Sequence, residues 1–156
     1  MALRGRTNVS LDERSRLTLP VQLREELGDN NLFISQGLGK SLWLFGSAAW
    51  YEKVEGTVSK NSELFSEQDQ LVVREYISPS HEIKIDKAGR ILIPEDLREY
   101  AGITKECKVV GMLDHIEIWD LGLFQEYQSN PNRAAETKQA SEALSRRVRD
   151  EKGRKV

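Results

Sequence analysis

The chain has 156 residues, of which 38% are hydrophobic and 31% charged, and its formal net charge is −2. No apolar run approaches the ~20 residues that span a membrane and no signal peptide is expected, so these features exclude a membrane protein and we expect a cytoplasmic one. The single cysteine, Cys107, excludes an intramolecular disulfide and fits a reducing compartment.

The first predicted element is a β-hairpin over residues 9–19. Apolar and polar residues alternate on both sides of the polar segment 12–16, which is typical of two short, half-buried strands joined by a turn. Pro20 then opens a short helix, because proline fits a first helical position where no N–H is needed, and Gly28 ends it. Two further strands are predicted at about residues 32–35 and 42–45.

The segment from residue 47 to residue 78 is predicted to be helical. Behind Ser47, which we interpret as a helix cap, an apolar residue recurs every four positions from Trp50. A second helix is predicted behind Ser66, which forms a capping-box pattern with Asp69.

The hairpin, proline and helix then occur a second time. Residues 83–94 repeat residues 9–20 with each counterpart 74 positions later, and the same offset continues without a gap over some forty residues. Two copies of this size would each bury little surface alone, so a shared core or oligomerisation is expected. The matched pairs include Asp12 with Asp86, Arg16 with Arg90, Pro20 with Pro94, Gly37 with Gly111 and Trp50 with Phe124.

This repeat predicts a chain of four parts. They are a first repeat over residues 3–50, a helical connector over 51–78, a second repeat over 79–128 and a charged tail over 129–156. The tail has few large apolar residues, so it is expected to be either a charged helix or disordered.

Both copies carry an Asp-x-x-x-Arg element, which reads Asp-Lys-Ala-Gly-Arg-Ile-Leu-Ile-Pro over residues 86–94 in the second copy. Together with the tryptophan runs at residues 42–45 and 117–120, these elements resemble the MraZ family of bacterial transcriptional regulators over roughly residues 3–128. The resemblance implies a mainly β fold with short helices, of the α+β class. It would be a duplicated, swapped-hairpin AbrB-like β-barrel formed by two pseudo-symmetric halves.

The resemblance also implies a function. Family members assemble into homo-oligomeric rings, commonly of about eight or more subunits. They bind repeated boxes of double-stranded DNA upstream of the cell-division and cell-wall gene cluster that includes their own gene. They act mainly as repressors and associate with the nucleoid.

The first turn is the predicted DNA-binding element. Arg14 and Arg16 lie on it, a two-stranded ribbon fits the major groove, and an arginine can donate two hydrogen bonds to guanine. From the spacing alone, a structural pair between Arg16 and Asp12 that fixes the turn is equally consistent. The excess of arginine in residues 1–24 and the resemblance together favour DNA.

Arg6 and Arg4 are predicted to contact phosphates from the N-terminal strand, and an ordinary surface position is the alternative for Arg4. The second copy is interpreted as mainly structural or assembly-forming, because acidic residues surround its turn. The residues assigned to turn stabilisation or to secondary DNA contact are Asp12, Asp86, Lys87 and Arg90.

One residue departs from the family pattern. Ser15 stands where the pattern has glycine before the first-copy arginine, whereas Gly89 keeps that glycine in the second copy. Because glycine adopts a positive φ at little cost, Ser15 predicts either mild strain or a different first turn.

No catalytic residue, metal site, cofactor or small-molecule substrate is predicted. The two histidines, His81 and His115, are too isolated for a metal site, and the three tryptophans are interpreted as packing residues rather than base-stacking ones. The alternative function is a structural or protein-interaction ring whose arginine turns stabilise the assembly or bind an acidic partner.

Overall fold

Short strands and helices alternate in the computed structural model, which describes residues 2–154. The chain forms two units, the first extending to Leu121 and the second beginning at Gly122. The strands are β1 (Arg6–Ser10), β2 (Arg16–Thr18), β3 (Asn31–Gln36), β4 (Leu42–Gly46), β5 (His81–Lys84), β6 (Arg90–Leu92), β7 (Glu106–Gly111) and β8 (Ile116–Asp120).

Most helices are only one or two turns long. Those of the first unit are α1 (Val21–Leu27), the 3₁₀ turn η1 (Leu38–Lys40), α2 (Ser47–Trp50), the π-helical turn η2 (Tyr51–Glu55), α3 (Gly56–Asn61), α4 (Glu67–Val72), the π-helical turn η3 (Val73–Ile77) and α5 (Glu95–Ala101). The last two are α6 (Leu121–Ser129) and α7 (Arg133–Arg154).

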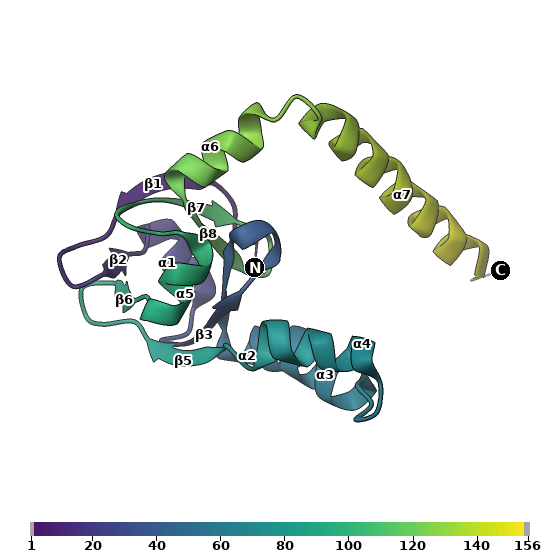
Figure 1. Cartoon of the computed structure of the whole chain (residues 1–156), viewed down its shortest axis with the longest axis horizontal. Coiled ribbons are helices and arrows are strands. Elements are labelled where there is room, and N and C mark those ends of the chain that lie inside the picture. The colour runs from purple at the N-terminus through teal and green to yellow at the C-terminus, as the bar shows by residue number, and fades with distance from the viewer. Residues whose placement is uncertain (1, 155–156) are drawn as a thin grey trace. The chain divides into compact units, whose positions relative to one another are not determined.

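Six strands form one antiparallel sheet in the order β1-β7-β8-β4-β3-β5, and β2 pairs with β6 as a separate two-stranded ribbon (Figure 1). The first strand of each repeat pairs with the other repeat. Val9 of β1 lies opposite Cys107 of β7, and Ile83 of β5 lies opposite Leu32 of β3. The predicted α+β fold with exchanged first strands is therefore confirmed.

A pseudo-twofold axis relates the two repeats. It passes between Leu17 and Ile91, which face each other at the centre of the β2–β6 ribbon, and again between Trp43 and Glu117 in β4 and β8. Both pairs are separated by the offset of 74 that the sequence shows.

The offset does not hold everywhere, however. In the strand ladders Cys107 occupies the place of Leu32, which is a separation of 75. The loop before β7 is therefore one residue longer than the loop before β3, and the loop after β7 is one residue shorter. The gapless match of Gly37 with Gly111 was wrong in detail, because the two changes cancel in the sequence.

One core serves both repeats. The ribbon residues Leu17 and Ile91 are fully buried and belong to the same apolar cluster as Ile34 and Ile118 of the sheet. Helices α1 and α5 each follow a proline, and each ends at a glycine in the left-handed region, Gly28 or Gly102, as their sequences predict. This shared core holds the ribbon and its turns in place.

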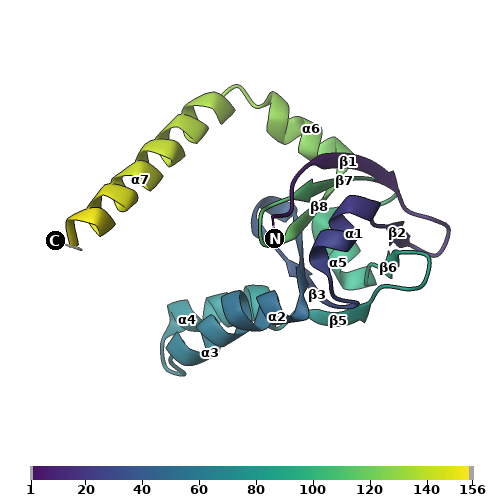
Figure 2. The ribbon, with the colours of Figure 1, turned by 180° about the vertical axis from the view of Figure 1, so that it is seen from behind.

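The connector is a helical hairpin, and it projects away from the end that carries the β1–β2 and β5–β6 turns (Figures 1 and 2). Ser66 caps α4 as predicted, with its Oγ accepting a hydrogen bond from the Asp69 amide. The cap assigned to Ser47 was wrong, because Gly46 occupies that position and the Ser47 hydroxyl donates instead to the Asn31 carbonyl, at 2.8 Å.

The tail is helical rather than disordered in its described part. Helix α7 is mostly polar, and none of its residues is buried, including its large apolar residues Leu144 and Val148. No helix in residues 2–154 combines the length and apolarity needed to cross a membrane.

Candidate nucleic-acid interface

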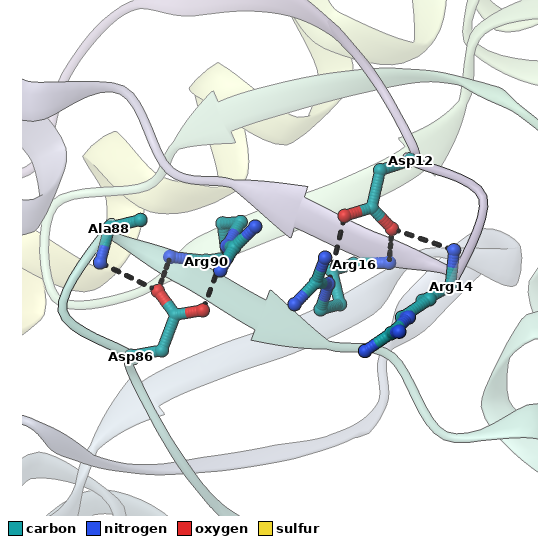
Figure 3. A network of polar contacts seen from close by, with 6 residues as sticks. All are labelled: Asp12, Arg14, Arg16, Asp86, Ala88 and Arg90. Atoms are coloured by element: carbon teal, nitrogen blue, oxygen red, sulfur yellow. Dashed lines mark hydrogen bonds and ion pairs between the residues drawn. The ribbon is translucent and has the colours of Figure 1, made fainter.

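Asp12 organises the first turn. Its Oδ1 accepts hydrogen bonds from the amides of Arg14 and Arg16, both at 2.9 Å, and its Oδ2 accepts one from the Arg16 Nε at 2.8 Å (Figure 3). The Asp12 amide in turn donates to the Arg16 carbonyl. The structural pair between Asp12 and Arg16 is therefore present.

The second turn has the same geometry. Asp86 accepts from the amides of Ala88 and Arg90 at 2.9 Å and from the Arg90 Nε at 2.8 Å (Figure 3). Ser15 has a φ of 60° where Gly89 has 81°. Of the two outcomes predicted for Ser15, the structure shows a left-handed serine in an unchanged turn.

The network keeps both aspartates ionised. The backbone amide of Arg16 is the largest influence on Asp12, and with the Arg14 amide and the Arg16 guanidinium it lowers the pKa of that carboxyl despite some desolvation. The Arg90 amide and guanidinium lower the pKa of Asp86 in the same way. Each turn is thus fixed by a charged carboxylate at neutral pH.

The two turns differ in the side-chain donors that remain available to a ligand. Arg14 is exposed, and its guanidinium has no hydrogen-bond or ion-pair partner among residues 2–154. Arg16 uses its Nε in the turn, so the edge formed by Nη1 and Nη2 remains for a second acceptor. The place of Arg14 in the second turn is taken by Ala88, so only the first turn has an uncommitted guanidinium.

Both turns belong to one surface. Ile93 donates to the Ser15 carbonyl and Leu19 donates to the Gly89 carbonyl, so each turn lies at one end of the short β2–β6 ribbon (Figure 3). At a rise of ~3.3 Å per residue, the four positions from Ser15 to Leu19 separate the turns by about 13 Å. That span is close to the ~12 Å width of the major groove of B-DNA.

Acidic side chains accompany the second turn. Glu82, Glu95 and Asp96 are exposed on the neighbouring β5 and α5, and Asp96 lies 3.1 Å from the His81 Nε2. At the corresponding places around the first turn the chain has Asn8, Val21 and Gln22, all uncharged.

Arg6 and Arg4 lie away from the first turn. Arg6 begins β1 opposite Val110, five residues before Leu11 and so roughly 17 Å along the strand. Arg4 lies beyond it, where its backbone passes directly over Gly111. Both side chains are exposed, but the structure does not bring them together with Arg14 and Arg16.

One basic residue beside the first turn escaped prediction. Lys105 precedes β7, and its carbonyl accepts a hydrogen bond from the Leu11 amide at 2.8 Å. An open surface hollow is lined by Leu11, Asp12, Glu13, Arg14, Arg16 and Lys105. No local pattern in the sequence marks Lys105, because only the exchange of β1 brings it to this turn.

The tryptophans and the potential metal ligands are the other candidate sites. Trp50 and Trp119 are buried, and Trp43 stacks on Tyr76 with ring centroids 5.1 Å apart, so the tryptophans pack within the protein as predicted. Residues 2–154 contain no cluster of three or more histidine, cysteine or carboxylate side chains that could hold a metal ion.

Comparisons with known proteins agree with the repeat. The chain matches the model of the family described as "MraZ protein, putative antitoxin-like" twice, over residues 2–73 and 77–147. A protein named "Transcriptional regulator MraZ" from Treponema denticola is 40% identical over 142 residues, which is 90% of this chain and 95% of the relative. Proteins of the same name from Treponema pallidum (strain Nichols) and Clostridium acetobutylicum are each 36% identical over 126 residues, covering 81% of this chain and 84% and 87% of the relatives.

Proposed function

Because the chain belongs to the MraZ family, whose similar members are named transcriptional regulators, we propose that it regulates transcription by sequence-specific binding to double-stranded DNA. The observation that carries this proposal is the unequal pair of turns. Both are built on the same aspartate network, but only the first adds an exposed arginine that the turn does not use.

Arg14 and Arg16 are the proposed base-reading residues. The β2–β6 ribbon enters the major groove, and each guanidinium presents two N–H donors to the O6 and N7 of a guanine. A bidentate pair of this kind discriminates against a wrong base by roughly 1–3 kcal/mol. Asp12 holds the Arg16 side chain in place before DNA arrives, so less side-chain entropy is lost on binding.

A homo-oligomeric ring, of about eight or more subunits, supplies the remaining affinity. One turn makes few contacts, but adjacent subunits on successive boxes make the later contacts intramolecular, which adds a factor of ~10²–10⁴. Boxes spaced by about one helical turn present the same side of the DNA to successive subunits. The proposed targets are boxes upstream of the cell-division and cell-wall gene cluster that includes the protein's own gene. Repression follows because a nucleoid-associated ring occludes the promoter.

A footprint with the full-length protein on the DNA upstream of its own gene tests the proposal. We expect protected boxes, and an affinity that falls steeply as salt rises, because released counterions contribute to binding. Arg14→Ala should abolish this protection while leaving the assembly mass unchanged. Protection by Arg14→Ala equal to that of the wild type at physiological salt would contradict the assignment.

The alternative function, a ring whose arginine turns only stabilise the protein, is favoured by the ion pair between Arg16 and Asp12. Arg90 provides the matched control, because Arg90→Ala removes the equivalent ion pair from the second turn. On our proposal, Arg16→Ala loses DNA binding and Arg90→Ala retains most of it. Equal losses in unfolding free energy or assembly, together with no DNA footprint from the wild type, would support the alternative.

A further inference from the structure

We propose that Lys105 binds one phosphate of the DNA backbone beside the bases read by Arg14 and Arg16, and that this contact exists only because the two repeats exchange their first strands. This inference rests on the proposed function and adds to it a residue from the repeat otherwise interpreted as structural.

The position of Lys105 is fixed by backbone contacts. The hydrogen bond from the Leu11 amide to its carbonyl extends the β1–β7 ladder by one step beyond the pair of Ser10 and Glu106. Its side chain is exposed, and its ammonium has no partner among the described residues. Together with Arg14 and Arg16, it lines the hollow beside the first turn.

The second turn lacks such a residue. The hydrogen bond equivalent to that of Leu11 and Lys105 runs from the Ile85 amide to the Asn30 carbonyl, at 3.0 Å. An exposed but uncharged asparagine therefore stands where the first turn has lysine. Because Ala88 also replaces Arg14, the second turn has neither of these cations, and its exposed Lys87 stands where the first turn has Glu13.

The chemistry of the residues divides their roles. A guanidinium offers a planar fork that matches a base edge, whereas an ammonium is a compact charge whose three donors suit a phosphate oxygen in many directions. Lys105 lines the hollow from the segment before β7, whereas Arg16 begins β2, so Lys105 is suited to fix the position of the ribbon rather than to read bases.

Two carboxylates, Asp12 and Glu13, also line the hollow and affect how strongly a phosphate would bind there. Asp12 is occupied by its three hydrogen bonds to Arg14 and Arg16. Glu13 is exposed and is the acidic group that would oppose a phosphate there. Removing its charge with Glu13→Gln should therefore strengthen DNA binding.

The test uses full-length protein and two duplexes of equal length, one carrying a single box protected in the footprint and one of random sequence. Lys105→Ala should weaken binding to both duplexes by the same factor. The slope of log K against log salt should become shallower by about 1. Arg14→Ala should reduce the preference for the box as well.

A double variant that moves the lysine distinguishes an effect of its position from an effect of the net charge of the protein. Lys105→Asn combined with Asn30→Lys keeps the composition of the chain but moves the cation to the second turn. We expect this double variant to bind as weakly as Lys105→Asn alone. Wild-type affinity for the double variant, or an unchanged salt slope for Lys105→Ala, would overturn the phosphate site. Failure of the wild type to bind either duplex would instead overturn the proposed function.

Discussion

At the scale of single residues, the two turns allow serine and glycine to be compared at the same position. Ser15 and Gly89 both lie in the left-handed region, in turns with the same hydrogen bonds. For a residue with a Cβ atom this region costs about 1 kcal/mol of conformational free energy, whereas for glycine it costs little. The first turn therefore carries strain that the aspartate network offsets.

Exchanging these residues should change stability in opposite directions. Ser15→Gly should raise the free energy of unfolding by up to about 1 kcal/mol, less the entropy that glycine gains in the unfolded chain. Gly89→Ser should lower it, because a Cβ there also meets the Arg24 side chain, which would have to move. Urea unfolding measures both changes. A loss of stability in Ser15→Gly would show that the serine is not strained.

At the scale of elements, alternation, prolines and glycines predicted most strands and the two short helices α1 and α5, because these signals act within a few residues. Ser66 was correctly predicted as a cap for the same reason. Ser47 was not, because its partner is the Asn31 carbonyl of a different strand. Lys105 illustrates the same limit for the site, since its contact with Leu11 joins distant segments.

Loss of the Ser66 cap is predicted to destabilise the connector locally rather than the whole first unit. Ser66→Ala should destabilise α4 by about 1 kcal/mol, because the Asp69 amide loses its acceptor. Hydrogen exchange of the amides in residues 67–77 should accelerate about fivefold, while exchange in β8 should not change. Equal acceleration in both segments would mean that the connector does not open on its own.

At the scale of the molecule, each repeat completes the sheet of the other, and both bury their apolar residues in one core. Neither repeat can lose its structure without removing a strand from the other. The first unit should therefore unfold in a single transition, in spite of the internal repeat.

Cys107 reports on that transition. It lies on β7 between β1 and β8, fully buried, and burial raises the pKa of its thiol to about 12. The folded-state pKa lies above the unfolded value, so burial of the protonated thiol contributes to stability. That contribution is complete below about pH 9 and is lost as pH rises towards 12. At pH 8, alkylation by iodoacetamide should follow global unfolding in urea. Rapid alkylation of the native protein would mean that β7 opens locally.

The exchange of strands has a consequence for synthesis on the ribosome. Asn8 of β1 contacts Lys108 of β7 across 100 positions of the chain. At roughly 5–20 residues per second, about 5–20 s pass between the emergence of the first strand and that of its partner. During this interval the nascent first repeat has no neighbour for β1, and β3 also waits for β5. The sheet is complete only after translation has passed β8, which joins β7 to β4, so folding of the first repeat is a late event governed by the second.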